Sequence, residues 1–345
     1  MTVLEVEDLE VYYDSEQGTV KAVDGVSFRV EDGENLGLVG ESGCGKSTLA
    51  KAIIGILPQN GYVNGGSIRL DGEDLTDVPE RRRRELRWDE ISMIAQSAMN
   101  ALDPVYTVRE QILEAIEVHR PGMNRTDAQD RIDEMFDLVG LDRERQTEYP
   151  HQFSGGMRQR AMIAMALVLE PSLILADEPT TALDVIMQDQ ILKRINGIQS
   201  ENDSSMVVIT HDVAVVAETC DRVVVMYAGQ IAEEGPAEDI FERPYHPYTL
   251  GLKSAFPNIR RADQDLVSIG GNPPELHDPP SGCRFHERCP MATEECTAEH
   301  LPAVRTDGLR TYCHHVDDVD SRLRPVADEA ETWDQETGDG GVADD

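Results

Sequence analysis

The sequence predicts an α/β fold in which a parallel sheet is covered by helices. Short apolar segments of strand character alternate with segments of helical spacing along the 345 residues, and such alternation is typical of parallel sheets. The clearest unit begins with the apolar run 36–39, passes through a glycine-rich loop that starts at Gly40, and leads into a helical pattern from Lys46. This order of strand, glycine loop and helix predicts a tight turn at the end of a sheet strand.

Further strands are predicted from apolar alternation or from short apolar runs. Apolar and polar residues alternate over 3–6 and 26–30, which indicates half-buried strands. Continuous apolar runs at 91–95, 173–176 and 206–210 predict strands that are buried on both faces.

Helical spacing governs three other segments. Residues 107–139 place apolar side chains at helical intervals, which predicts a helical subdomain inserted between two strands. Residues 157–169 predict a helix that is apolar on most sides, and residues 183–199 predict another helix.

The charge balance is strongly acidic. The chain has 31 Lys plus Arg against 66 Asp plus Glu, a formal net charge of −35. Such a surface repels phosphate backbones and argues against a nucleic-acid partner. An acidic surface with few lysines suits very high salt, where screening removes self-repulsion, so we expect a halophilic source.

No segment predicts a membrane span or a secretory signal. The longest apolar run, 161–169, is far shorter than the roughly 20 residues that cross a bilayer, and the N-terminus lacks a basic region followed by a long apolar one. We therefore expect an intracellular protein that reaches a membrane only through a partner.

Composition divides the chain into three parts. Residues 1–255 form the predicted α/β domain, with its helical subdomain at about 97–165. Residues 256–325 contain a stretch rich in Gly and Pro at 270–281, followed by four of the six cysteines, which predicts a small Cys-rich module. Residues 326–345 are acidic and are expected to be disordered.

The glycine-rich loop fits the phosphate-binding pattern G-x-x-x-x-G-K-[ST] in full. Its residues are Gly40, Glu41, Ser42, Gly43, Cys44, Gly45, Lys46, Ser47 and Thr48. Glycines allow backbone N–H groups to point inward at phosphates, and the following helix adds the positive end of its dipole. Lys46 is expected to reach the β- and γ-phosphates of a nucleotide, and the Ser47 hydroxyl to bind Mg²⁺.

Two carboxylates follow the apolar run 173–176. Asp177 is suited to hold Mg²⁺, and Glu178 is placed to polarise an attacking water as a general base. Acids at a strand end are common in a chain this acidic, so the pair gains meaning from the phosphate loop upstream.

A second glycine pair stands just before the helix at 157–169. Ser154 is a good N-cap, and Gly155 and Gly156 leave N–H groups open at the helix start, next to Met157. Such a helix start is either an ordinary cap or a second phosphate-binding site.

Together these motifs resemble the ABC ATPases. The phosphate loop, Gln96, the Ser154 segment, Asp177 with Glu178, Asp184 and His211 stand in the order of that family. The resemblance implies a P-loop NTPase with a RecA-like parallel sheet core, an antiparallel β subdomain and an inserted helical subdomain.

The resemblance also implies a role for each residue. Two domains pair head to tail, and each ATP lies between one phosphate loop and the partner's segment at Ser154, Gly155, Gly156 and Met157. Gln96 contacts Mg²⁺ and water, His211 contacts the γ-phosphate, and Asp184 communicates across the dimer. Tyr13 is the expected aromatic on adenine, with Tyr12 as the alternative.

A narrower resemblance is to the ATPases of oligopeptide and dipeptide importers. It is carried by residues 97–104, 157–160 and 246–249 and by the elements around Cys283 and Cys289. It implies a second ATPase subunit, two membrane permeases and an extracellular solute-binding protein, with this chain on the cytoplasmic face of the membrane. The alternatives are import of oligosaccharide or nickel, and a soluble ABC ATPase that acts on ribosomes or DNA.

Four cysteines crowd the C-terminal module at Cys283, Cys289, Cys296 and Cys313. Their spacing lacks the short gaps of usual zinc sites, and stable disulfides are rare in the cytosol. The resemblance implies a [4Fe–4S] cluster, while zinc or free thiols remain as alternatives, and a redox-responsive regulatory role is a further possibility. Cys44 and Cys220 are expected to be packing residues.

Overall fold

A computed structural model describes residues 1–96, 101–180, 187–188, 191–195, 197, 204–254, 268–297, 303–306, 308–324 and 332–333. The expected site residue Asp184 lies outside this part of the chain, as do most of the helix expected at 183–199, residues 97–100 and most of the acidic tail.

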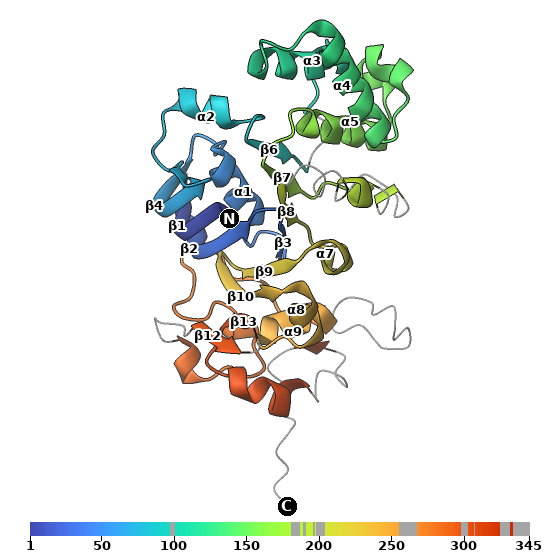
Figure 1. Ribbon diagram of the computed structural model, residues 1–345. Helices are drawn as coiled ribbons and strands as arrows, with labels where there is room; N and C mark the ends of the chain where they lie inside the picture. The colour runs from blue at the N-terminus through green and yellow to red at the C-terminus, as the bar shows by residue number, and fades with distance from the viewer. Residues whose placement is uncertain are drawn as a thin grey trace, which may run out of the picture.

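An eight-stranded sheet forms the centre of the molecule (Figure 1), with the strand order β12-β13-β10-β9-β3-β8-β7-β6. The strands β9, β3, β8, β7 and β6 run parallel to one another, whereas β10 pairs with β9 antiparallel. Their bounds are β3 Asn35–Val39, β6 Ile91–Ile94, β7 Leu173–Asp177, β8 Ser205–Ile209 and β9 Arg222–Tyr227. Every residue of β7 and β8 is buried, as expected for strands covered on both faces.

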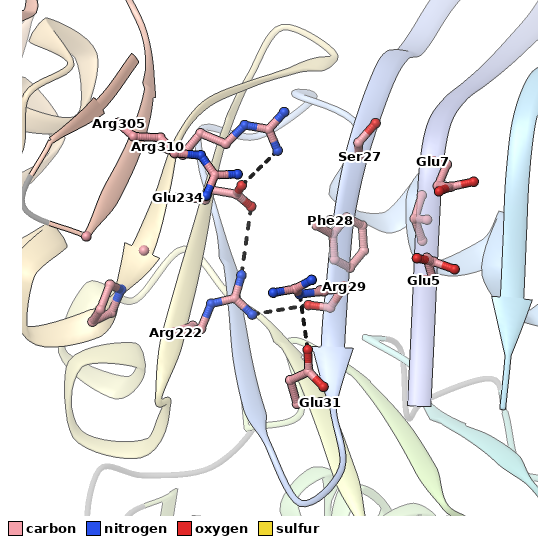
Figure 2. A pocket seen from close by; sticks show the side chains of 14 residues that line it. Glu5, Glu7, Ser27, Phe28, Arg29, Glu31, Arg222, Glu234, Arg305 and Arg310 are labelled. Carbon is pink, nitrogen blue, oxygen red and sulfur yellow. Dashed lines mark hydrogen bonds and ion pairs between the residues drawn. The ribbon is translucent and has the colours of Figure 1, made fainter. Parts of the chain in front are cut away.

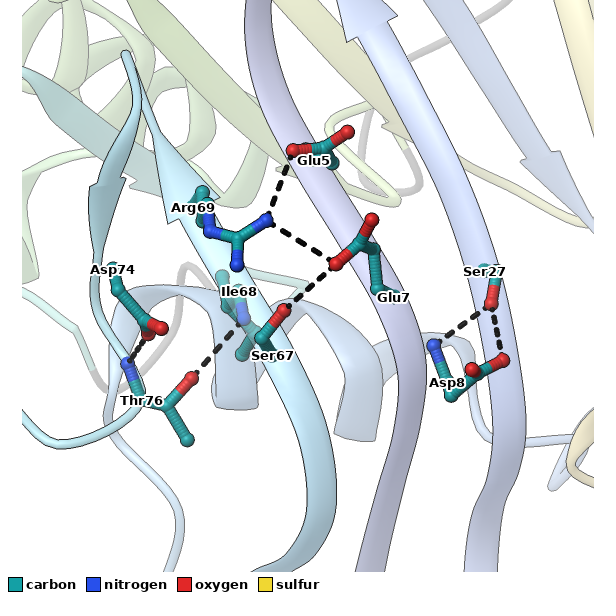
Figure 3. Close-up of polar contacts among 9 residues, drawn as sticks. All are labelled: Glu5, Glu7, Asp8, Ser27, Ser67, Ile68, Arg69, Asp74 and Thr76. Atoms are coloured by element: carbon teal, nitrogen blue, oxygen red, sulfur yellow. Dashed lines mark hydrogen bonds and ion pairs between the residues drawn. The ribbon is translucent and has the colours of Figure 1, made fainter.

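A second, antiparallel sheet packs beside the first, with the order β2-β1-β4-β5. Its strands are β1 Thr2–Ser15, β2 Gly18–Glu31, β4 Gly61–Leu70 and β5 Glu73–Asp74. The predicted strands at 3–6 and 26–30 are confirmed as parts of β1 and β2. Ion pairs cross the polar face of this sheet (Figure 3), where Arg69 Nη1 lies 3.4 Å from Glu5 and 3.2 Å from Glu7.

The predicted inserted subdomain is helical in the structure. It contains α3 Val108–His119, α4 Arg125–Leu138 and α5 Gly155–Leu167. Thr107 and Glu110 form a reciprocal capping box at the start of α3, and Asn124 caps α4, which fixes where both helices begin. Apolar side chains at helical spacing, such as Ile112, form its core.

The C-terminal segment continues the main sheet. The hairpin of β12 Ala303–Thr306 and β13 Leu309–Tyr312 pairs with β10 Gln230–Pro236. The buried carboxylate of Glu233 on β10 accepts hydrogen bonds from Thr311 Oγ1 and from the backbone N–H of Tyr245. The C-terminal segment therefore shares a sheet and a hydrophobic core with the α/β domain.

Helices on the faces and loops complete the fold. They are α1 Lys46–Ile54, α2 Glu80–Leu86, α7 Val213–Thr219, α8 Ala237–Glu242 and α9 Pro247–Ser254. Short 3₁₀ segments lie at Arg143–Thr147, Pro150–Gln152, His286–Arg288, Glu294–Thr297 and Val316–Asp318, and a π turn at Val319–Leu323. The short strands β11 Ser268–Ile269 and β14 Thr332–Trp333 pair in parallel. In the described ranges, no helix has the length and apolar character that crossing a bilayer requires.

Candidate active site

The phosphate loop leaves the carboxyl end of β3, which lies between β8 and β9. Gly40 and Gly45 have φ angles of 151° and 106°. A Cβ at Gly40 would lie 2.1 Å from the Met226 carbonyl, and one at Gly45 would lie 2.2 Å from the Ala22 carbonyl. Only glycine fits these two positions, so the motif's glycines shape the loop as expected.

Lys46 begins α1 and is only 8% exposed. Its ammonium group donates to the carbonyls of Gly40 at 2.7 Å and Glu41 at 2.9 Å. The positive charge therefore lies over the loop itself, within reach of phosphates held by the loop's N–H groups.

Ser47 and Asp177 meet across the sheet edge. Ser47 Oγ donates to Asp177 Oδ1 at 3.1 Å, and Asp177 is 3% exposed at the end of β7. Burial raises the pKa of the Asp177 carboxyl, and the Ser47 hydrogen bond opposes that shift. A hydroxyl and a carboxylate side by side are oxygen ligands of the kind that Mg²⁺ prefers. A bound Mg²⁺ would also compensate the buried negative charge of Asp177.

Glu178 is held between two side chains. Gln96 Nε2 donates to one carboxylate oxygen at 3.1 Å, and His211 Nδ1 lies 2.8 Å from the other. Glu178 has a φ of 48°, and its backbone N–H donates to the Ile209 carbonyl at 2.8 Å. A left-handed backbone conformation is strained for a glutamate. With this backbone, the Glu178 carboxylate lies between Gln96 and His211.

These groups come together because parallel strands end at the same sheet edge. Gln96 follows β6, Asp177 ends β7, His211 follows β8, and the phosphate loop follows β3. Ligands of open α/β sheets bind at this edge.

The two candidate aromatics differ in their surroundings. Tyr13 is half-buried, and its hydroxyl lies 3.0 Å from Thr48 Oγ1 in the phosphate loop. Tyr12 is buried, and its hydroxyl donates to Asp24 Oδ1 at 2.7 Å. Of the two, Tyr13 has the placement suited to a nucleotide base.

Ser154 caps α5, as its sequence context predicts. Its Oγ accepts a hydrogen bond from Met157 N at 3.3 Å, and the side chain is exposed. A Cβ at Gly155 would meet no atom within 4 Å. The helix start is therefore open to a ligand or a partner at Ser154 and Gly155, whereas Met157 packs partly against the core.

Two residues that contact the phosphate loop were not predicted as site residues. Tyr248 is fully buried, and its hydroxyl accepts from Glu41 N at 2.9 Å. Arg288 forms two hydrogen bonds with the Glu41 carboxylate, at 2.8 Å and 3.0 Å. Both lie in segments that carry the narrower resemblance, but no spacing rule connects them with a loop more than 200 positions earlier.

The four C-terminal cysteines are buried free thiols. Burial raises the pKa of Cys283 to about 11 and that of Cys313 to about 12, and the neighbouring cysteine sulfurs add to both shifts. Backbone N–H groups donate to the sulfurs of Cys289 and Cys313 at 3.4 Å and 3.3 Å. Within the residues that the structure describes, no three His, Cys, Asp or Glu side chains gather as ligands of one metal ion.

A separate cleft of about 470 Å³ lies between β2 and the C-terminal strands (Figure 2). Arginines and glutamates line it together, including Arg222, Arg310 and Glu234. Since these charges pair with one another, the cleft has no strong preference for a charged ligand.

Family models match both halves of the chain. The model described as "ABC transporter" matches residues 23–181. The model described as "Oligopeptide/dipeptide transporter, C-terminal region" matches residues 232–296, which include α9 and the first three cysteines of the C-terminal module.

Curated relatives align over nearly their whole length. The oligopeptide transport ATP-binding protein OppD of Salmonella typhimurium is 45% identical over 320 residues, covering 92% of this chain and 95% of the relative. The dipeptide transport ATP-binding protein DppD of Bacillus subtilis is 47% identical over 315 residues, covering 90% and 94%. DppD of Escherichia coli is 44% identical over 330 residues, covering 94% and 100%.

Solved structures show the same fold. A dimeric bacterial ABC transporter cassette has a TM-score of 0.63 and 26% identity, and it covers 68% of this chain and 98% of the cassette. The CbiO1 component of a Clostridium perfringens ABC transporter complex has a TM-score of 0.58 and 27% identity, covering 70% and 92%. From its aligned relatives and its two matching family models, the chain belongs to the oligopeptide/dipeptide family of ABC transporter ATP-binding proteins.

Proposed function

We propose that this chain binds and hydrolyses ATP to drive import of dipeptides or oligopeptides through separate membrane subunits. The observation that carries the ATPase assignment is the convergence of Gln96, Glu178 and His211 beside the phosphate loop. The peptide assignment rests on the relatives, whose names specify oligopeptide or dipeptide transport.

The phosphate loop, residues 40–48, holds the triphosphate through its N–H groups, and Lys46 neutralises the β- and γ-phosphates. Mg²⁺ is held by Ser47 and Asp177, with Gln96 near it, and Tyr13 stacks on adenine. The contact between Ser47 and Asp177 supports this ion site, because it brings a hydroxyl and a buried carboxylate to one point.

Glu178 acts as the general base. Its carboxylate takes a proton from water while the water oxygen bonds to the γ-phosphorus and the bond to the ADP oxygen breaks. His211 and Gln96 fix the two carboxylate oxygens, which orients Glu178 toward the water.

The working unit is a dimer of ATPase domains. The helix start at Ser154, Gly155, Gly156 and Met157 closes over the partner's ATP, and Asp184 acts across the same interface. Two permeases and an extracellular solute-binding protein complete the transporter, with this chain at the cytoplasmic face of the membrane. A solved relative of the same fold is a dimeric cassette, which supports this arrangement.

A Glu178→Gln variant tests the mechanism. We expect it to bind ATP, to form a stable ATP-dependent dimer, and to hydrolyse ATP at least ~100-fold more slowly than the native chain, the loss typical of a missing general base. Nucleotide titration, size-exclusion chromatography with ATP, and phosphate release measure these three properties. Near-native phosphate release by the variant means that Glu178 is not the base.

Transport identifies the solute. In vesicles that hold the full transporter, we expect ATP hydrolysis to rise when the binding protein is loaded with a dipeptide or oligopeptide, and no such rise with Glu178→Gln. Stimulation by an oligosaccharide or nickel, with none by peptides, contradicts the peptide assignment and leaves the ATPase assignment intact.

We also propose a [4Fe–4S] cluster on Cys283, Cys289, Cys296 and Cys313. When bound, it supplies cross-linking through four iron–sulfur bonds to a segment with few apolar residues of its own. The N–H groups that donate to the sulfurs of Cys289 and Cys313 oppose the burial that raises the pKa of both thiols. A single zinc ion requires thiols around one point, whereas a cluster binds each cysteine at a different iron and needs wider spacing. Iron and sulfide analysis of anaerobically purified protein tests this, and stoichiometric zinc in a colourless protein overturns it.

A further inference from the structure

Arg288 connects the Cys-rich module with the phosphate loop. It ends a 3₁₀ turn directly before Cys289 and is 7% exposed. Its Nη1 and Nη2 donate to the two oxygens of Glu41, and Nη1 also donates to Tyr227 Oη at 3.0 Å. Nε donates to the Gly270 carbonyl at 2.8 Å. The guanidinium is therefore engaged on every nitrogen, so its position is fixed.

Glu41, the second residue of the phosphate loop, is held at each of its polar groups. Its carboxylate pairs with Arg288, its backbone N–H donates to Tyr248 Oη, and its carbonyl accepts from Lys46 Nζ. Two of these three contacts come from residues beyond position 240. The conformation of the loop's first turn therefore depends on the C-terminal half of the chain.

A cluster of buried aromatic rings packs against the Arg288–Glu41 ion pair. Tyr227, Tyr248 and Phe285 form an aromatic cluster with ring centroids 4.6 to 5.4 Å apart. The Arg288 guanidinium lies 5.7 Å from the Tyr227 ring centroid and 5.8 Å from that of Phe285. Buried aromatic rings and a stacked guanidinium restrict movement of the ion pair.

The ion pair between Arg288 and Glu41 affects nucleotide binding through its charges. Glu41 places a carboxylate in a loop built to receive a triphosphate, and the two negative groups repel. A bidentate arginine neutralises the carboxylate and fixes the position of both of its oxygens. Removal of Arg288 alone leaves a partly buried, unpaired negative charge in the loop.

We propose that Arg288 is a positioning residue for the phosphate loop, and that through its ion pair with Glu41 the Cys-rich module sets the affinity for ATP. The proposal rests on the proposed function, since it requires that the loop bind ATP. It assigns the module a part in nucleotide binding that is separate from any metal content.

The test is a double-mutant cycle in the full-length chain, with Arg288→Gln, Glu41→Gln and the combination of both. The readouts are titration with a fluorescent ATP analogue and steady-state ATP hydrolysis. We expect Arg288→Gln to weaken ATP binding by about 10-fold, about 1.4 kcal/mol, with KM raised and kcat within about 2-fold of native. Glu41→Gln weakens binding less, because it removes the repelling charge together with the bond.

The double variant decides between positioning and general support. If Arg288 acts through Glu41, adding Glu41→Gln to Arg288→Gln restores much of the lost affinity. A double variant that binds ATP as weakly as Arg288→Gln, or more weakly, overturns the proposal.

Arg310→Gln is the matched control. Arg310 lies on β13 of the same C-terminal segment, which β10 and β9 separate from β3 and its phosphate loop. Its Nη1 pairs with Glu234 Oε1 at 3.0 Å (Figure 2). We expect its ATP affinity to be native. An equal loss in Arg310→Gln means that the effect is general destabilisation, and it overturns the proposal.

Three further results separate the possible failures. If Arg288→Gln does not fold, Arg288→Lys keeps the charge but loses the bidentate geometry, and an affinity equal to native contradicts the proposal. Absence of ATP binding in the native chain is a failure of the proposed function. Native binding that none of these variants changes is a failure of the inference about Arg288 alone.

Discussion

At the scale of single residues, Tyr12 and Tyr13 show how neighbours on one strand take different tasks. Alternation along β1 turns successive side chains to opposite faces. Tyr12 is buried and bonded to Asp24, whereas Tyr13 stands beside Thr48 of the phosphate loop. The same strand thus supplies one residue to the hydrogen bonds of the sheet and one to the edge of the phosphate loop.

Substitution of Tyr13 tests this division. We expect Tyr13→Ala to weaken ATP binding by about 10-fold, within the ~1–3 kcal/mol found for stacking of a base on an aromatic ring, and Tyr13→Phe to retain most of the affinity. Titration with a fluorescent ATP analogue measures both. Tyr12→Ala is the matched comparison, and a larger loss there than in Tyr13→Ala would place adenine on Tyr12.

Residues joined by local patterns were predictable, and residues joined across the chain were not. Gln96, Glu178 and His211 follow strands of one parallel sheet, so their convergence follows from the strand assignment and the family pattern. The contacts of Tyr248 and Arg288 with Glu41 depend on how a segment more than 200 positions later folds back. No periodicity or motif spacing encodes such a contact.

At the scale of elements, the start of α9 depends on a buried histidine. His246 lies directly before Pro247 and is 3% exposed, and its Nδ1 accepts a hydrogen bond from Tyr248 N at 3.0 Å. Burial lowers the pKa of His246 to about 3. The imidazole is therefore neutral in the folded protein and holds the helix start as a hydrogen-bond acceptor.

This histidine makes stability depend on pH. Its pKa is about 6.5 in the unfolded chain and about 3 in the folded one, so below pH 6.5 the unfolded chain binds the extra proton. The contribution is complete above pH 6.5 and is lost as the pH falls toward 3, by up to about 1.4 kcal/mol per pH unit.

Chemical denaturation between pH 5 and pH 7 measures this effect. We expect His246→Gln to be less stable at pH 7 and to lose stability less steeply on acidification than the native chain. Equal slopes in the two proteins would show that His246 titrates normally. The difference between the two slopes of stability against pH removes the contribution of carboxylates that titrate alike in both proteins.

Element lengths were less predictable than element types. The strands at 3–6 and 26–30 extend to 14 residues each in β1 and β2, because pairing along the hairpin continues through polar residues that break the apolar alternation. The pairing of β13 with β10 could not be foreseen, since it joins the Cys-rich segment to a strand about 75 positions earlier.

At the scale of the whole molecule, net charge governs the response to salt. The formal charge of −35 leaves more acidic groups than the 31 Lys and Arg can pair. Ion pairs such as Arg69 with Glu5 weaken in salt, but repulsion among the unpaired carboxylates weakens too. Because the unpaired charges exceed the pairs, relief of repulsion is the larger effect.

We therefore expect the melting temperature to rise as KCl increases from ~0.01 M to ~1 M, over which the screening length falls from about 30 Å to about 3 Å, and the chain to unfold in low-salt buffer. Differential scanning fluorimetry measures this, with an uncharged osmolyte at equal osmolality as the control. Full stability at the lowest salt would contradict both the electrostatic argument and the halophilic source.

The pairing of β13 with β10 has a consequence for how this protein can change. An edge strand with unpaired backbone N–H and C=O groups is a template for aggregation. The hairpin β12–β13 pairs with β10, so that this side of β10 is not an exposed edge. A chain truncated after α9 would lack the hairpin and would expose the edge of β10 in the central sheet. Truncation before the hairpin is therefore expected to promote aggregation, whatever the cysteines bind. Added sequence is better tolerated after the hairpin than before it.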